Sequence, residues 1–238
     1  MSSLVVTDLV KRYDKKLALD GVSMRAEPGQ LLGLVGSNGA GKTTLFQSVA
    51  ALIRIDAGTI TVDGAERGSI PARRALGYLP EEPVLWPDLT VAEHLQFIAR
   101  AYSVPDWKPK ATDLLERMRL TESRDAKGGA LSQGMRRKVA LAMVLLHDSS
   151  VLLLDEPFNG LDPEAQHELR TIVRELREHG TCIVLSSHRL AELEALADCY
   201  VVLAKGKVVA DGSLGDLRTT IGLADEADLE TIYLSLMA

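Results

Sequence analysis

The chain has 238 residues, of which 46% are hydrophobic and 25% charged, so it can bury a substantial core as one large domain or two small ones. Its formal net charge of −6 is opposite to the basic excess of a nucleic-acid-binding protein, and we expect no nucleic-acid partner. No apolar run approaches the ~18 residues that span a bilayer, and the first residues lack a signal-type apolar core, so we expect neither an integral membrane protein nor a secreted one.

The first quarter of the chain is rich in strand-like segments. Runs of apolar and β-branched residues lie at residues 4–6, 17–24, 31–35 and 58–62. A Pro28-Gly29 turn precedes the third run. This part of the sequence therefore predicts strands joined by tight turns.

From about residue 89 the apolar residues change to helical spacing. Two runs carry them at helical intervals: Val91, Leu95 and Ile98, and then Leu114, Leu115 and Met118. Ser132 is placed to cap a third helix. The apolar stripe of that helix is Met135, Val139, Met143 and Leu146, and the cations off the stripe are Arg136, Arg137 and Lys138. We therefore expect a helical insertion in the middle of the chain.

Strand and helix patterns alternate again after this insertion. Apolar runs of strand length lie at residues 151–154 and 182–185, and helices are expected to open at Asp162-Pro163 and after Ser187. Such βαβ units predict a parallel sheet. Residues 200–210 predict a hairpin, followed by short helices.

The two cysteines, Cys182 and Cys199, lie in or beside apolar strands. They lack the close pairing of a zinc site. We expect reduced thiols in the core of a cytosolic protein.

Residues 36–43 read Gly-Ser-Asn-Gly-Ala-Gly-Lys-Thr, directly after the run at 31–35 and before a helix-like segment at 43–51. In this context, G-x-x-x-x-G-K-[ST] predicts a phosphate-binding loop. Glycines let backbone N–H groups turn around phosphate oxygens, and the helix N-terminus adds positive potential. Lys42 then supplies a charge for the β- and γ-phosphates, and Thr43 a hydroxyl for Mg²⁺. The alternative is a glycine-rich turn with a surface lysine, which the flanking strand and helix disfavour.

A second motif follows the apolar run at 151–154, which ends in Asp155 and Glu156. Ligands of parallel sheets bind at the carboxyl ends of strands, where acids suit metal and water chemistry. The alternative is a strand end that merely reaches solvent. Together with the phosphate loop, the two carboxylates predict a nucleotide hydrolase.

Between these motifs lies Leu131-Ser132-Gln133-Gly134-Met135. This ordered set of motifs resembles the ATP-binding subunit of an ABC transporter over nearly the whole chain. The family signature is Leu-Ser-Gly-Gly-Gln, so Ser132 and Gly134 match while Gln133 and Met135 depart. The resemblance implies that Ser132 and Gly134 grip the γ-phosphate of ATP held by a second copy of the protein. The alternative for Ser132 is a plain helix cap.

The resemblance also implies the fold. We expect an α/β P-loop NTPase of ABC type, with a RecA-like parallel sheet core, an antiparallel β subdomain and an inserted α-helical subdomain. Within a single domain, 1–238, the core and β subdomain are expected at about 1–88 and 148–220. The helical subdomain is expected at about 89–147 and a short helical tail at about 221–238.

The site that the resemblance implies binds ATP and Mg²⁺. The residues expected to hold ATP are Tyr13, Gly36, Ser37, Asn38, Gly39, Ala40, Gly41, Lys42, Thr43, Thr44, Ser132 and Gly134. Tyr13 resembles the aromatic residue that stacks on adenine, with a half-buried strand tyrosine as the alternative. Thr43 and Asp155 would direct Mg²⁺.

Three residues are expected to be catalytic: Lys42, Glu156 and His188. Glu156 would orient the attacking water and help to deprotonate it. His188 resembles the switch histidine that touches the γ-phosphate, and it is the one histidine of five that follows a strand such as 182–185. The alternative is an exposed or merely hydrogen-bonded histidine.

One departure concerns the metal site. The family has a glutamine that meets the metal and the transmembrane partner, and this sequence offers Glu81 at that place. A carboxylate still binds Mg²⁺ or its water, but its charge also repels the triphosphate. We include Glu81 among the metal-site residues and expect an effect on coupling. Residues 159–162 resemble the loop that communicates across the dimer, although Asp162 also suits a helix cap.

The resemblance implies that ATP closes two subunits face to face and that hydrolysis reopens them, moving the helices of a transmembrane permease at the cytoplasmic face of the membrane. Leu-Pro-Glu-Glu and Leu-Ser-Gln-Gly-Met-Arg-Arg-Lys are similar to the ATPases of ABC-2-type exporters. One alternative is a soluble ABC ATPase for iron–sulfur assembly or DNA repair. Another is a nucleotide-binding scaffold that hardly turns over.

Overall fold

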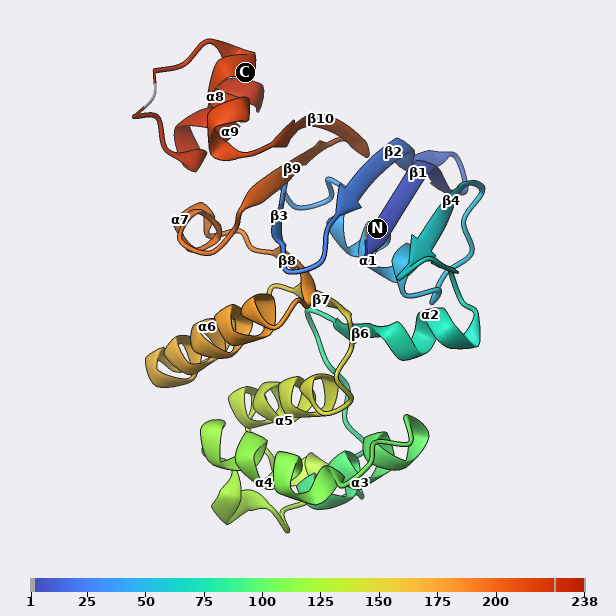
Figure 1. Ribbon diagram of the computed structural model, residues 1–238, viewed down its shortest axis with the longest axis vertical. Helices are drawn as coiled ribbons and strands as arrows, with labels where there is room; N and C mark the ends of the chain where they lie inside the picture. Colours follow the sequence, from blue (N-terminus) through green and yellow to red (C-terminus); the bar gives the residue numbers. More distant parts are fainter. Residues whose placement is uncertain (1–2, 225, 238) are drawn as a thin grey trace.

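The computed structural model describes residues 3–224 and 226–237, which form two β-sheets and a block of helices (Figure 1). The main sheet lies in the middle, with the smaller antiparallel sheet beside it. The helical block lies at one end of the molecule, opposite the C-terminal helices α8 (Leu214–Ile221) and α9 (Leu229–Met237).

The smaller sheet is antiparallel, with strand order β2-β1-β4-β5. Its strands are β1 (Leu4–Tyr13), β2 (Lys16–Ala26), β4 (Ala57–Val62) and β5 (Ala65–Glu66). The first strand is longer than the sequence predicted, because exposed polar residues such as Asp8 and Arg12 continue the ladder with bulges in its register.

The main sheet has strand order β10-β9-β3-β8-β7-β6, in which β10 pairs antiparallel with β9 and the other pairs are parallel. Its strands are β3 (Leu31–Val35), β6 (Leu76–Leu79), β7 (Val151–Asp155), β8 (Cys182–Ser186), β9 (Cys199–Ala204) and β10 (Lys207–Gly212). Every residue of β3, β7 and β8 is buried. Cover on both faces explains why these strands are continuous apolar runs rather than alternating ones.

Helices follow the parallel strands in the expected order. α1 (Lys42–Val49) follows β3, α6 (Pro163–Glu178) follows β7, and α7 (Leu190–Glu194) follows β8. The alternating side chains of the strands meet different partners. Leu32 and Val184 pack in one cluster with α1 and the smaller sheet, whereas Leu31 and Ile183 pack in another with the helical side.

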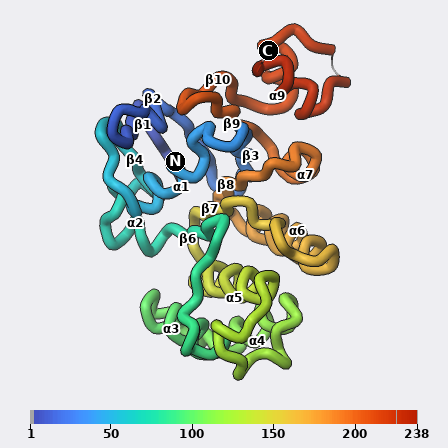
Figure 2. Tube along the Cα trace, turned by 180° about the vertical axis from the view of Figure 1, so that it is seen from behind, coloured from blue at the N-terminus to red at the C-terminus, as the bar shows by residue number. Residues whose placement is uncertain are grey.

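The helical block is inserted between β6 and β7. It contains α3 (Val91–Ala101), α4 (Trp107–Arg117) and α5 (Gln133–Leu145), with 3-10 turns at Thr121–Ser123 and Gly128–Ala130. From the front and from behind, α5 lies between the core and the outer helices α3 and α4 (Figures 1 and 2). The caps expected at Ser132 and Asp162 are confirmed, because their side chains accept the N–H groups of Met135 and Ala165.

The predicted architecture of a parallel core sheet, an antiparallel sheet and inserted helices is confirmed. The sequence analysis did not predict the helix α2 (Ile70–Ala75) or the strand β6. The strand β6 is short and forms by pairing with β7. Gly77 in β6 packs so closely that a Cβ there would lie 2.8 Å from the Ser149 hydroxyl. The subdomain boundaries stay predictions. Among residues 3–224 and 226–237, none of the helices has the length and apolar character needed to cross a bilayer.

Both cysteines are free, with Cys182 buried in β8 and Cys199 partly buried at the start of β9. Burial raises the pKa of the Cys182 thiol to about 12 and that of the Cys199 thiol to about 11. Both side chains therefore stay protonated near neutral pH, as expected for core thiols.

Candidate functional site

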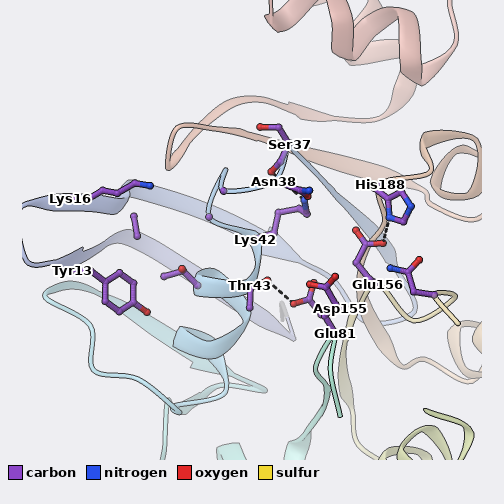
Figure 3. Close-up of a pocket in the computed structure, with 15 residues that line it drawn as sticks. Tyr13, Lys16, Ser37, Asn38, Lys42, Thr43, Glu81, Asp155, Glu156 and His188 are labelled. Carbon is purple, nitrogen blue, oxygen red and sulfur yellow. Dashed lines mark hydrogen bonds and ion pairs between the residues drawn. The ribbon is translucent and has the colours of Figure 1, made fainter. Parts of the chain in front are cut away.

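A cavity of about 630 Å³ opens at the carboxyl ends of the parallel strands (Figure 3). The start of α1 contributes Lys42 and Thr43, the end of β7 contributes Asp155 and Glu156, and the segment after β8 contributes His188. The topology thus brings together residues from positions 42 to 188 at the edge of the sheet where ligands of such folds bind.

The loop from Gly36 to Gly41 requires glycine for two different reasons. Gly39 and Gly41 have φ angles of +80° and +115°, which side chains disfavour. At Gly36 the limit is space, because a Cβ there would lie 2.7 Å from the carbonyl oxygen of Leu203. The loop ends at the N-terminus of α1, whose unpaired N–H groups favour anions.

Lys42 is buried, with 8% of its surface exposed, and its Nζ donates to the carbonyl oxygen of Gly36 at 2.6 Å. The carbonyl oxygen of Ser37 lies 3.4 Å from the same nitrogen. These main-chain acceptors hold the ammonium group against the cavity without neutralising it. An anion in the cavity would therefore meet a positive charge that its hydrogen-bond acceptors leave intact.

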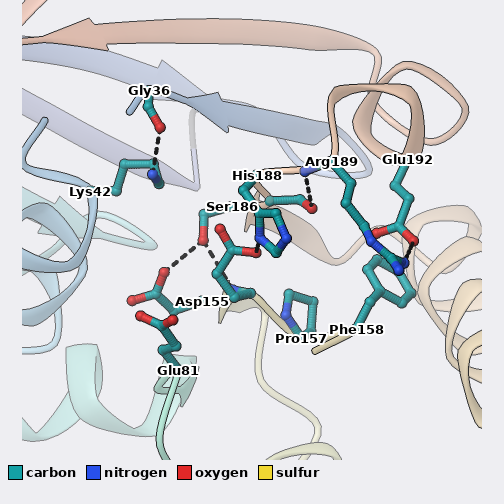
Figure 4. Close-up of polar contacts among 12 residues, drawn as sticks. Gly36, Lys42, Glu81, Asp155, Pro157, Phe158, Ser186, His188, Arg189 and Glu192 are labelled. Atoms are coloured by element: carbon teal, nitrogen blue, oxygen red, sulfur yellow. Dashed lines mark hydrogen bonds and ion pairs between the residues drawn. The ribbon is translucent and has the colours of Figure 1, made fainter. Parts of the chain in front are cut away.

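Asp155 is held between two hydroxyl groups. Thr43 Oγ1 donates to Asp155 Oδ2 at 2.9 Å (Figure 3), and Ser186 Oγ donates to Oδ1 at 2.6 Å (Figure 4). Burial raises the pKa of Asp155 and the nearby charge of Glu156 adds to the rise, although both hydroxyl groups and Lys42 act in the opposite direction. A carboxylate with this balance would gain from a bound cation. The oxygen donors of Thr43 and Asp155 are the type that Mg²⁺ prefers.

Glu156 is fixed at its main chain and at its carboxylate. Its φ of +51° is in the left-handed region, which is uncommon for a non-glycine residue. Its N–H donates to Ser186 Oγ at 3.0 Å, and its Oε2 lies 2.8 Å from His188 Nδ1 (Figure 3). His188 is 55% exposed along its side chain, whereas Glu156 is 8% exposed. The carboxylate therefore sits in the wall of the cavity while the imidazole reaches its mouth.

The predicted outer residues also line this cavity. Tyr13 is 45% exposed, and the ammonium of Lys11 lies 5.0 Å from the centre of its ring. Glu81 is exposed near Asp155, and Asn159 contributes from the loop after β7 (Figure 3). The complete lining is Tyr13, Lys16, Ala18, Ser37, Asn38, Gly39, Gly41, Lys42, Thr43, Thr44, Glu81, Asp155, Glu156, Asn159 and His188.

Ser132 and Gly134 are placed elsewhere, and within the described chain they do not line the cavity. Ser132 is exposed at the start of α5. A Cβ on Gly134 would lie 2.9 Å from the carbonyl oxygen of Gly160, so the start of α5 packs closely against the loop after β7. These two residues therefore belong to a second surface of the same chain.

Sequence reasoning missed several residues of the site. Lys16 and Ala18 of β2 line the cavity, and Ser186 joins Asp155 to Glu156. The signal for Ser186 was its position before Ser187 and His188 at a strand end. No sequence pattern indicated Lys16, because it reaches the cavity only through the packing of the smaller sheet beside the main sheet.

Arg137 and Lys138 also differ from a simple amphipathic helix. They lie off the apolar stripe of α5 as expected, but they are buried, with 7% and 9% of their surfaces exposed. Lys138 Nζ donates to Asp162 Oδ2 at 2.7 Å. Arg137 donates to main-chain carbonyl oxygens of the last residue of β7 and of the segment that follows it.

Comparisons with known proteins agree with this geometry. A family model described as ABC transporter matches residues 19–159. The Nod factor export ATP-binding protein I of Burkholderia thailandensis is 40% identical over 227 residues, which cover 94% of this chain and 74% of that protein. The ABC-type transporter ATP-binding protein EcsA of Bacillus subtilis is 35% identical over 99% of this chain and 97% of its own length. A solved structure of the ATP-binding subunit of an ABC transporter aligns with a TM-score of 0.96 at 34% identity, covering 100% of both chains.

Proposed function

This chain belongs to the ABC transporter family as an ATP-binding subunit that hydrolyses ATP, and from that premise we propose that it powers an exporter by closing with a second subunit around bound ATP. The resemblance that the motifs indicated is thereby confirmed at the level of the family. One observation carries the proposal: Lys42, Asp155 and Glu156 converge on one cavity, whereas Ser132 lies outside it at an exposed helix start.

In this proposal the loop from Gly36 to Thr44 wraps the triphosphate. Its N–H groups and the N-terminus of α1 bind phosphate oxygens, and Lys42 leaves its carbonyl acceptors for the β- and γ-phosphates. Tyr13 offers its exposed ring to adenine at the edge of the cavity.

Thr43 and Asp155 would hold Mg²⁺, with Glu81 close enough to the cavity to take part. The donors are a hydroxyl and carboxylates, which suit this cation. When bound, Mg²⁺ neutralises charge on the β- and γ-phosphate oxygens. Ser186 keeps one oxygen of Asp155 occupied, so that the other is directed toward Thr43.

Glu156 would activate the water. The water oxygen attacks the γ-phosphorus, the bond to ADP breaks, and Glu156 accepts the proton that the water loses. The hydrogen bond from His188 and the constrained main chain hold the carboxylate in one orientation. The side chain of His188 is exposed, so its imidazole can also contact the γ-phosphate.

A second copy or a homologous subunit would complete the site. The exposed hydroxyl of Ser132, the N–H groups near Gly134 and the start of α5 form an anion-binding surface that needs a ligand from outside the chain. A triphosphate bound in the cavity of one subunit and covered by this surface of the other would join the two subunits.

The relatives favour export as the task. One is named for Nod factor export, and the lipopolysaccharide export protein LptB of Haemophilus influenzae is 34% identical over 90% of this chain. The membrane partner would be a permease that holds the chain at the cytoplasmic face. An apolar cavity of about 210 Å³ between Tyr78 and Tyr102, beside the exposed Val84 and Trp86, offers a place for a permease helix near Glu81.

The test has two parts. The purified chain should release phosphate from Mg·ATP, and Glu156→Gln should bind ATP without releasing phosphate. The chain expressed from its own locus should copurify with a multi-span membrane protein. Phosphate release together with reproducible recovery of soluble partners alone would favour a soluble ABC ATPase and contradict the transport role.

A further inference from the structure

Arg137 makes an unusual set of contacts at the back of the site. Its Nε donates to the carbonyl oxygen of Pro157 at 3.2 Å, and its Nη2 donates to that of Asp155 at 3.2 Å. The same Nη2 donates to the carbonyl oxygen of Glu156, and Nη1 donates to that of Glu81. One buried guanidinium group thus binds the main chain at four positions.

These four carbonyl groups belong to the two segments that carry the acidic residues of the cavity. Arg137 holds the carbonyl group of Glu156, while Ser186 holds its N–H group at 3.0 Å. The two contacts restrain the peptide groups on both sides of a residue with a φ of +51°. A left-handed non-glycine residue of this kind persists only where its surroundings fix it.

The charge of Arg137 also acts on the carboxylates of the cavity. Among the described residues, no carboxylate forms an ion pair with it, although the charges of Glu81, Glu156 and Asp155 all act on it. Burial lowers the pKa of Arg137, and those three carboxylates oppose that effect. The guanidinium group remains charged at any ordinary pH and offsets part of their negative charge.

We propose that Arg137 is a positioning residue for hydrolysis, which fixes Glu156 and Glu81 through their main chains and whose charge allows a carboxylate at position 81 to stand beside the triphosphate. The inference rests on the proposed function of the same cavity. Arg137 lies on α5 only five positions after Ser132, so it also joins the surface that would meet a second subunit to this chain's own carboxylates.

Two substitutions of Arg137 separate the effect of its hydrogen-bond geometry from the effect of its charge. Arg137→Lys keeps the charge, but an ammonium group cannot reach four carbonyl oxygens in the plane of a guanidinium. Arg137→Gln removes the charge as well. Glu81→Gln removes the extra carboxylate charge while keeping the size of the side chain.

The experiment measures two quantities for each variant: ATP affinity in EDTA, and kcat with saturating Mg·ATP. Arg137→Gln should weaken ATP affinity about fivefold, because uncompensated carboxylates repel the triphosphate. Arg137→Lys should keep the parent affinity. Both variants should lower kcat by about tenfold or more, because hydrogen bonds to a charged donor are lost. Adding Glu81→Gln to Arg137→Gln should restore affinity but not kcat.

Arg174→Gln is the matched control, because Arg174 is exposed on α6 and its loss should change neither quantity. Thermal unfolding checks that each variant folds. If Arg137→Gln does not fold, two other measurements test the inference. Arg137→Lys should have a lower kcat than the parent, and Glu81→Gln alone should bind ATP more tightly than the parent.

The inference is overturned if Arg137→Lys keeps the parent kcat, or if Glu81→Gln does not improve affinity in either background. A parent chain that releases no phosphate would overturn the proposed function and this inference with it. An active parent with unchanged Arg137 variants would overturn the inference alone.

Discussion

The cavity and the start of α5 are the two surfaces of this chain that we propose to bind phosphate, and they differ in how complete they are. In the cavity, Thr43 bonds directly to Asp155, while the Gly36 carbonyl oxygen holds Lys42 and His188 holds Glu156. At the start of α5, Ser132 is exposed, and its only task within the described chain is to cap its own helix.

This difference indicates a separate role for each surface. The cavity is organised before any ligand arrives, which suits groups that must be in place for water attack. At the start of α5 the Ser132 hydroxyl accepts the Met135 N–H of its own helix, and in our proposal this exposed helix start also receives a phosphate brought by another molecule. Nucleotide binding and subunit closure should therefore fail separately.

The largest effect is expected in the cavity, for Glu156→Gln. The variant should bind ATP as the parent does but release phosphate on the order of 10² to 10⁴ times more slowly, because the water loses its proton acceptor. Single-turnover phosphate release measures the loss. Hydrolysis at the parent rate would show that Glu156 is not the base.

The next test addresses the start of α5. Ser132→Asp keeps a good helix cap but places a negative charge where the γ-phosphate of the other subunit should lie. We expect unchanged ATP affinity in the isolated chain and a loss of hydrolysis of at least about tenfold. Ser132→Asn, a neutral cap, is the control. Hydrolysis at the parent rate by Ser132→Asp as well as by Ser132→Asn would mean that no phosphate approaches this surface.

Lys42→Ala should weaken ATP binding itself, whereas Ser132→Asp should leave it unchanged. Lys42→Ala removes the charge that the cavity presents to the triphosphate, and ATP affinity should fall by about 10- to 100-fold, as hydrogen bonds to charged groups suggest. Isothermal titration gives the affinity, and Lys108→Ala on the exposed side of α4 is the control. An affinity equal to that of the control would contradict the phosphate-loop assignment.

Tyr13 should give the smallest effect of these variants. Loss of a stacking ring costs roughly 5- to 100-fold in affinity for a base, and the exposed position of Tyr13 places it at the low end. Tyr13→Phe keeps the ring and should bind ATP normally. If Tyr13→Phe loses as much affinity as Tyr13→Ala, the hydroxyl rather than the ring makes the contact.

Sequence patterns predicted the core strands because their causes are local. The strand Leu31–Val35 was placed at its observed bounds, since a turn precedes it and a glycine loop follows it. The strand Leu76–Leu79 was missed, because four residues that include a glycine become a strand only through pairing with β7. Local patterns carry no information about such a partner.

The candidate site shows the same limit. Lys42, Asp155 and His188, which the motifs singled out, line one cavity, since strand ends of a parallel sheet share one edge, and their roles there stay predictions. The motifs did not indicate that Arg137 is buried, because three consecutive cations resemble a solvated helix face. Its acceptors at Glu81 and Pro157 lie 56 and 20 positions away in the sequence, so only the tertiary structure reveals them.

The central claim is that ATP joins two copies of this site, and light scattering of Glu156→Gln tests it most directly. With saturating ATP, the mass should approach twice the 25.8 kDa of one chain, and it should stay at one chain when Ser132→Asp is added. A mass that remains at one chain for Glu156→Gln at saturating ATP would contradict the account.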